Sequence, residues 1–171
     1  MLQIIIIIAV VAADQLVKFL VSPVLQALPG ETLPVIQNVF HLTYVENTGA
    51  SFGILQGSRV FFIIVTIIVL IVAAVLMIRT HRSQSLFLKI TLSLVIGGTL
   101  GNFVDRIIYG FVRDMFDFRL IHFWVFNVAD MCLVIGAILL GIYILFIYKE
   151  QDKKSLFERR EKTKENDEHI R

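Results

Sequence analysis

Long uncharged runs of apolar residues constrain this chain more than any other feature of its sequence. Residues 60–78 contain no charged side chain, and Thr66 is their only polar member. A helix that crosses a bilayer needs about 20 predominantly apolar residues. The chain is 57% hydrophobic and 18% charged, against about 45–50% and about 25% in soluble domains. Both observations indicate a membrane protein.

Three further runs are long enough to cross a bilayer, so four spans are expected, at residues 2–20, 60–78, 86–104 and 123–148. The first run reaches this length only if Asp14 and Lys18 lie in its last turns. It has no basic residue ahead of the apolar run, as a cleaved signal peptide usually has, so we interpret it as a retained helix. We expect one membrane domain, residues 1–148, with an outer segment at 21–59.

Lysine and arginine are distributed unequally between the two sides of the predicted spans. One side holds eleven, namely Arg79, Arg82, Lys89 and eight residues of the tail from Lys149. The other side holds Arg59, Arg106, Arg113 and Arg119, with Lys18 at its border. The positive-inside rule therefore places both termini in the cytoplasm. The tail, residues 149–171, nearly balances its cations with seven acids, which indicates a solvated segment.

The acidic residues outside the tail gather on the predicted outer side. They are Asp14, Glu31, Glu46, Asp105, Asp114, Asp117 and Asp130. An aspartate costs about 2.5–3.5 kcal/mol at the centre of a spanning helix and less toward its end. Several acids at one level indicate a functional site, although an ordinary hydrated rim would also be polar.

The spacing of polar and small residues favours a site. Gly97, Gly101 and Asp105 recur at steps of four, so they share one helix face, where small residues let another helix approach closely. Asn102 precedes Asp105 by three residues, and Asn127 precedes Asp130 by three on the first turns of the last predicted span. Polar side chains are thus expected at the outer ends of two helices.

Asp114 and Asp117 lie among aromatic and apolar residues in "YGFVRDMFDF", which is unusual for a solvated loop. We expect this segment at the membrane surface, with Asp114 opposite Asp130. Two carboxylates about 3 Å apart would repel by about 5 kcal/mol at an effective dielectric constant of 20. They would therefore share one proton and titrate as a pair. Such a pair can activate water and polarise a carbonyl, which is the chemistry of aspartic peptide hydrolysis.

Other interpretations of these residues remain open at this stage. Asp105, Asp114, Asp117 and Asp130 could hold Mg²⁺ in a lipid phosphotransferase, or the acids could serve an ion carrier. Asn47 could be a plain turn asparagine. His122 and Trp124 are expected to be anchors at the membrane interface, and Cys132, the single cysteine, a small buried residue.

Five blocks together resemble the bacterial lipoprotein signal peptidase family, also called signal peptidase II. They are "DQLVK" (14–18), "VENTGASFG" (45–53), "GGTLGNFVDR" (97–106), "VRDMFDF" (112–118) and "FNVAD" (126–130). The resemblance implies an aspartic endopeptidase that cuts the signal peptide from a prolipoprotein before a diacylglyceryl-modified cysteine. It also implies a catalytic dyad of Asp114 and Asp130.

The resemblance further implies which residues support the dyad. They are Asn47, Gly49, Asn102, Arg106 and Asn127 around the site, with Asp14, Lys18 and Asp105 behind it. Two positions depart from the family pattern: Ser51 stands where many members have alanine, and Arg113 where many have valine. Neither replaces a proposed catalytic group.

The fold implied by the resemblance is an all-α integral membrane protein with four transmembrane helices. A small extracytoplasmic β-containing cradle and an interfacial arm complete it, and "VFHLTYV" (39–45) has the residues that strands favour. Such a protein would lie in the bacterial cytoplasmic membrane as a monomer, with its active site near the extracytoplasmic face. Its partners would be the prolipoprotein and membrane lipids, without nucleic acid, metal or cofactor.

Overall fold

A computed structural model describes residues 1–49, 57–79 and 85–148, and these contain four long helices. They are α1 (Leu2–Gln26), α2 (Arg59–Arg79), α3 (Leu86–Ile108) and α4 (Val128–Ile142), the last continued by a π-helical turn, Tyr143–Tyr148. Each is long and apolar enough to cross a membrane, if the α4 span is taken to Phe146. The four predicted spans are thus confirmed as helices.

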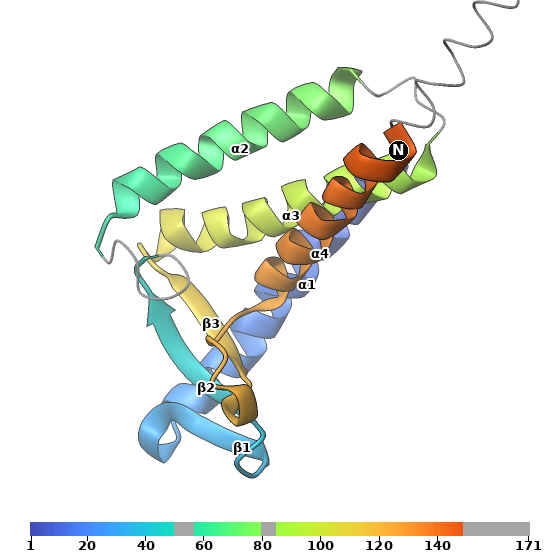
Figure 1. The fold of residues 1–171 in the computed structure, drawn as a ribbon. Helices are drawn as coiled ribbons and strands as arrows, with labels where there is room; N and C mark the ends of the chain where they lie inside the picture. The colour runs from blue at the N-terminus through green and yellow to red at the C-terminus, as the bar shows by residue number, and fades with distance from the viewer. Residues whose placement is uncertain (50–56, 80–84, 149–171) are drawn as a thin grey trace, which may run out of the picture.

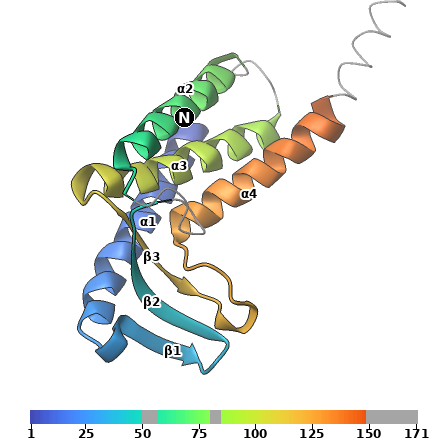
Figure 2. The ribbon, with the colours of Figure 1, turned by 60° about the vertical axis from the view of Figure 1, so that its left-hand side comes forward.

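Helix α3 is the central helix and contacts the other three (Figures 1 and 2). In the apolar stretch of α3, 61% of the residues are buried. The corresponding share is 11–17% in the other three helices, whose apolar side chains face outward. Glycines on α3 permit this packing. A Cβ atom at Gly101 would lie 2.9 Å from the Cβ of Ala129 and 2.9 Å from Asp14 Oδ2, and one at Gly97 would lie 2.8 Å from the Cβ of Val10. The predicted close approach is therefore confirmed.

Three antiparallel strands form a small sheet at one end of the helices. They are β1 (Thr32–Ile36), β2 (Phe40–Asn47) and β3 (Val112–Asp117), in the order β1-β2-β3. Short 3₁₀ turns, Pro29–Glu31 and Arg119–Ile121, precede β1 and follow β3. The strand expected at 39–45 is confirmed as most of β2. The third strand comes from the segment that carries Asp114 and Asp117, called the aspartate segment below. Asp114 on this strand pairs with Val45 of β2.

The aspartate segment is more deeply buried than a surface segment would be. Met115 is fully buried and packs with Leu25 of α1 and Tyr44 of β2. This contact explains why α1 continues to Gln26, beyond the predicted boundary at residue 20: its last turns support the sheet rather than only cross a bilayer. The sheet therefore combines β1 and β2, which lie within the segment 21–59, with β3 from a distant part of the chain.

The last helix begins at Val128, whereas the prediction began the span at residue 123. Phe126 is extended, and it exchanges backbone hydrogen bonds with Phe116 of β3 at 2.8 and 3.1 Å. Asn127 then caps the helix. The apolar character of residues 123–126 indicated a continuous span, but hydropathy does not distinguish an apolar extended segment from the first turn of a helix.

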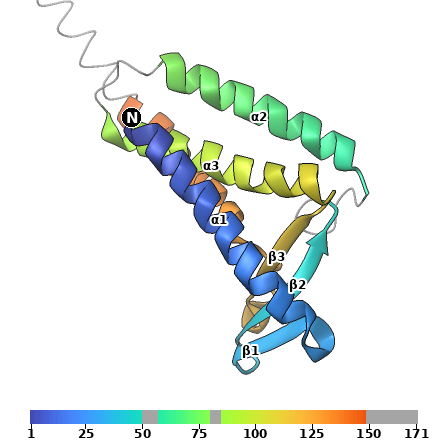
Figure 3. The same cartoon turned by 180° about the vertical axis from the view of Figure 1, so that it is seen from behind.

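The two ends of the molecule differ. The N-terminus, the C-terminal ends of α2 and α4, and the start of α3 lie at one end, and the sheet lies at the other (Figures 1 and 3). Of the acidic and amide residues that the sequence singled out, five lie where the sheet meets α3 and α4: Asn47, Asn102, Asp114, Asn127 and Asp130. The fold thus brings "VENTG", "GNFVDR", "VRDMF" and "FNVAD" together from four separate parts of the chain.

Candidate active site

Asn127 joins the two aspartates of the predicted dyad. It precedes α4, and its side-chain Nδ2 donates a hydrogen bond to Asp114 Oδ1 on β3 at 2.6 Å. Its backbone N–H donates to Asp130 Oδ2 at 3.2 Å, while its Oδ1 accepts from the Asp130 N–H at 2.9 Å. This reciprocal pair is a capping box. Asn127 therefore both caps α4 and contacts the carboxylates of Asp114 and Asp130.

Two more asparagines each donate a hydrogen bond to one of the aspartates. Asn47, at the end of β2, donates from Nδ2 to Asp114 Oδ2 at 2.9 Å, and its Oδ1 accepts from the Gly49 N–H at 3.0 Å. Asn102 on α3 donates from Nδ2 to Asp130 Oδ1 at 2.6 Å. Its Oδ1 accepts from Asn127 Nδ2 at 3.0 Å. Every carboxylate oxygen of the pair thus accepts a hydrogen bond from an asparagine.

The electrostatic surroundings of Asp114 favour its protonated form. Asp114 is 1% exposed. Two effects raise the pKa of Asp114 from 3.8 to about 7: burial is the larger, and the negative charge of Asp130 is the next. The Asn47 and Asn127 donors and the Lys18 charge act in the opposite direction. A carboxyl group that ionises near neutral pH is suited to general acid and base catalysis.

Two pockets meet at Asp130. The first, of about 190 Å³, has a mixed lining that includes the polar side chains of Asn47, Asn102 and Arg106. The Arg106 guanidinium lies 5.3 Å from the centre of the Phe62 ring, and donates to the Gly49 carbonyl at 3.4 Å. This pocket provides polar groups next to the dyad.

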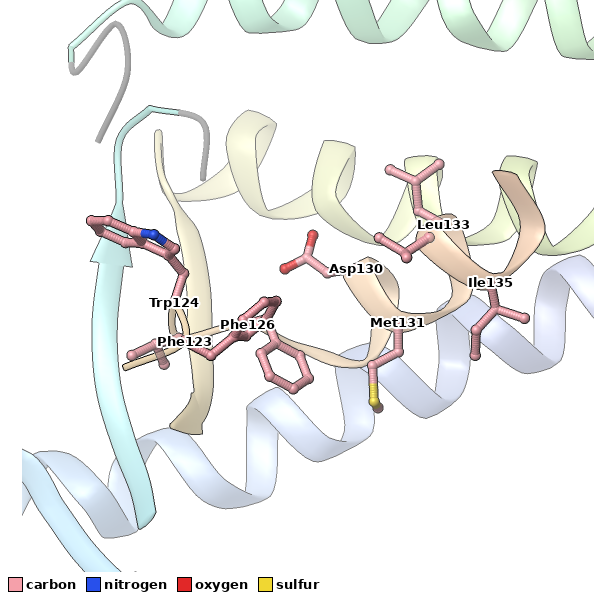
Figure 4. Close-up of a pocket in the computed structure, with 9 residues that line it drawn as sticks. Phe123, Trp124, Phe126, Asp130, Met131, Leu133 and Ile135 are labelled. Carbon is pink, nitrogen blue, oxygen red and sulfur yellow. The ribbon is translucent and has the colours of Figure 1, made fainter. Parts of the chain in front are cut away.

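The second pocket, of about 450 Å³, is mostly apolar and is lined by residues 123–126 and one side of α4. Figure 4 shows the Asp130 carboxylate directed toward the strands, with Met131 and Ile135 pointing to the opposite side of the helix. Phe126 lies beside the start of α4, and Trp124 lies farther from the helix on the segment that precedes it. A reacting group at Asp130 would therefore have polar contacts on one side and apolar contacts on the other.

Three of the predicted supporting residues lie behind the site and are fully buried. Lys18 Nζ lies 2.8 Å from Asp14 Oδ2 and 3.2 Å from Asp105 Oδ2, and all three side chains are 0% exposed. Lys18 also donates to Asn102 Oδ1 at 3.3 Å. Asp14 Oδ1 accepts from the Ala129 N–H at 2.9 Å. The Asp14–Lys18 pair, which could have been a mere helix end, belongs to the packing behind Asp130.

Sequence reasoning missed two members of this buried group, Gln15 and Arg113. Gln15 donates to Asp14, Asp105 and the Gly101 carbonyl at 3.0–3.1 Å. Arg113 pairs with Asp105 at 2.8 Å. The sequence did contain a signal for Arg113, because this cation lies next to Asp114 among apolar residues. A charge that is buried there requires a partner of opposite charge.

Other predicted residues lie away from the dyad. Asp117 accepts hydrogen bonds from Thr43 at 2.8 Å and Arg119 at 2.9 Å at the far end of the sheet. His122 and Trp124 are exposed, as interface anchors would be.

Cys132 is half-buried, not buried as expected, because it lies on a helix with only one packed side. Ser51 and Gly53 lie outside the described residues.

Comparison with known proteins decides between the three activities that the sequence left open. The signal peptidase II family matches residues 6–146. The chain belongs to this family. The predicted resemblance is confirmed, and with it an aspartic peptidase rather than a phosphotransferase or an ion carrier.

Individual relatives match over most of their length. A lipoprotein signal peptidase of Clostridioides difficile (strain 630) is 46% identical over 146 residues, covering 85% of this chain and 96% of that protein. One of Streptococcus pneumoniae is 41% identical over 142 residues, covering 82% and 90%. A solved bacterial membrane enzyme superposes with a TM-score of 0.72 at 35% identity, over 88% of this chain and 90% of that one.

Proposed function

We propose that this chain removes signal peptides from prolipoproteins by cutting before a diacylglyceryl-modified cysteine, with Asp114 and Asp130 as the catalytic dyad. Membership of the signal peptidase II family carries the activity. The single observation that carries the dyad is Asn127, which donates hydrogen bonds to both carboxylates. Burial and the nearby charge of Asp130 raise the pKa of Asp114 to about 7, which fits a pair that shares one proton.

In this mechanism the ionised carboxylate of the pair accepts a proton from a water molecule as its oxygen attacks the scissile carbonyl carbon. The protonated carboxyl donates to the carbonyl oxygen, so the tetrahedral intermediate carries no full negative charge. Collapse of the intermediate breaks the C–N bond, and the amine of the cysteine leaves with a proton from the pair. Asn47, Asn102 and Asn127 orient the four carboxylate oxygens throughout.

The remaining supporting residues divide between the pocket and the packing behind it. Arg106 and Gly49 line the polar pocket, where they would contact the substrate backbone. Asp14, Lys18 and Asp105 are fully buried, so they would hold the helices rather than contact substrate.

The described residues contain no group of three His, Cys, Asp or Glu side chains placed to hold a metal ion.

We place the sheet and the active site at the extracytoplasmic face of the bacterial cytoplasmic membrane, with both termini in the cytoplasm. The excess of Lys and Arg in residues 79–89 and 149–171 supports this orientation. The sheet would form the cradle that holds the substrate over the bilayer. Leu120, Ile121, Phe123 and Trp124, each 46–67% exposed, would enter the membrane interface beside it. The enzyme would act as a monomer on a lipid-modified prolipoprotein.

The purified protein should cleave a synthetic peptide with a diacylglyceryl-cysteine at the bond before that cysteine. The same peptide without the lipid should be cut on the order of 10²-fold more slowly, because binding energy from remote parts of a substrate supports the reacting centre. Mass spectrometry of the products checks the bond, and EDTA should leave the rate unchanged. Equal cleavage of both peptides, or loss of activity in EDTA, would contradict the proposal.

A further inference from the structure

Arg113, the residue before Asp114, is held at three points by one carboxylate. Its backbone N–H donates to Asp105 Oδ2 at 2.9 Å. Its Nε donates to the same oxygen at 3.3 Å, and its Nη2 donates to Asp105 Oδ1 at 2.8 Å. The residue is 8% exposed. Because Asp105 lies on α3, this contact attaches the strand that carries Asp114 to the central helix.

The Arg113 guanidinium also contacts the first helix and an aromatic ring. Nη2 donates to Gln15 Oε1 at 3.1 Å, and the guanidinium carbon lies 4.3 Å from the centre of the Tyr109 ring. On β2, Glu46 pairs with Arg113 in register, and its carboxylate accepts from the Tyr44 hydroxyl at 3.1 Å. A planar guanidinium with five N–H donors is suited to contact Asp105, Gln15 and the Tyr109 ring at once, whereas an ammonium group is not.

Arg113 balances the charge of the cluster behind the dyad. Asp14 and Asp105 contribute two negative charges, and Lys18 and Arg113 two positive charges. Burial by itself lowers the pKa of Arg113, but the hydrogen bonds and charge of Asp105 outweigh it and raise that pKa above its ordinary value. Removal of Arg113 would leave one buried negative charge uncompensated, and such a charge is unfavourable in a poorly hydrated site.

We propose that Arg113 is a positioning residue for Asp114, which fixes β3 against α3 and keeps the buried cluster electrically neutral next to the dyad. The inference rests on the proposed dyad. Arg113 acts through Asp105 and the strand backbone, and does not contact substrate.

The test compares three variants of the full-length protein in detergent, each assayed for kcat, KM and pH dependence on the lipid-modified peptide. Arg113→Met leaves the cluster with one extra negative charge, and Asp105→Asn leaves it with one extra positive charge. The double variant is neutral again. We expect the pH profile of kcat to move by about one unit toward alkaline pH in Arg113→Met and toward acid pH in Asp105→Asn. The double variant should return to the wild-type position.

Arg113→Lys separates charge from geometry. It retains the positive charge but loses the fork of donors, so its pH profile should stay in place while kcat falls about tenfold with KM unchanged. Thermal unfolding of each variant gives its stability. A variant that loses stability but keeps the wild-type kcat and pH profile shows a merely structural Arg113 and overturns the proposal.

Asp114→Asn in the same assay separates this inference from the proposed function. Cleavage by Asp114→Asn would refute the dyad itself, and the role of Arg113 with it. An inactive Asp114→Asn beside an Arg113→Met enzyme with unchanged kcat and pH profile would overturn only the role of Arg113. Opposite shifts in the two single variants that cancel in the double variant would support it.

Discussion

Asparagine in place of Asp114 or Asp130 should reduce kcat for cleavage of the lipid-modified peptide by about 10³-fold or more, because proton transfer by a positioned side chain contributes about 10²–10⁴-fold. Asparagine is close in size to aspartate and retains one oxygen acceptor for Asn127, so the fold should persist. The pair, however, would lose the group that accepts a proton from water or the group that donates one to the carbonyl. Product formation measured by mass spectrometry, beside a thermal unfolding curve, checks this.

The matched control is the same substitution three residues along the same strand. Asp117 is also buried, but it accepts hydrogen bonds from Thr43 and Arg119 at the far end of the sheet. Asp117→Asn should therefore keep kcat within a few-fold of wild type. Full activity of Asp114→Asn or Asp130→Asn, or an equally inactive Asp117→Asn, would show that the dyad has been placed wrongly.

Serine in place of Asn127 should separate the helix cap from the support of the dyad. Serine is as good an N-cap as asparagine, so the first turn of α4 should keep its bond from the Asp130 N–H. The donor to Asp114 Oδ1 would be lost. Removal of one preorganised donor in an active site costs about 10²–10³-fold in kcat, whereas the loss of this buried donor should lower the free energy of unfolding by about 1–3 kcal/mol.

A cap substitution elsewhere provides the control for Asn127→Ser. Ser85 caps α3 by accepting from the Leu88 N–H at 3.3 Å, at the end of α3 away from the sheet. Ser85→Ala should cost about 1 kcal/mol of stability and leave kcat unchanged. If the two variants lost stability and activity in parallel, Asn127 would act only as a cap, and its bond to Asp114 would have no role in the reaction.

Hydropathy predicted the four helices because the bilayer requirement leaves few alternatives. A run such as residues 60–78 has no other common structure in a membrane. The helix boundaries depended on tertiary contacts that hydropathy does not contain. Helix α1 extends to Gln26 because Leu25 packs under the sheet, and α4 begins late because Phe126 pairs with Phe116.

The residues of the candidate site, and the expectation that Asp114 lies opposite Asp130, came from the sequence, but most of the hydrogen-bond partners could not be predicted from it. The i, i+3 spacing of Asn127 and Asp130 placed them on one helix turn, and the structure adds the reciprocal hydrogen bonds. No local pattern indicates that Asn47 contacts Asp114, since they are 67 residues apart. The same holds for Arg113 and Gln15, which are 98 residues apart and meet only through the packing of α1 on β3.

The central claim, that Asp114 and Asp130 hold one proton between them, is tested most directly by a ¹³C NMR titration of aspartate carboxyl groups in the purified protein. Asp114 should be half-protonated near pH 7, assigned by its absence from Asp114→Asn. In Asp130→Asn its midpoint should fall, because the neighbouring charge is gone, yet stay above 3.8, because burial remains. A midpoint near pH 4 for Asp114, the same with and without Asp130, would contradict the account.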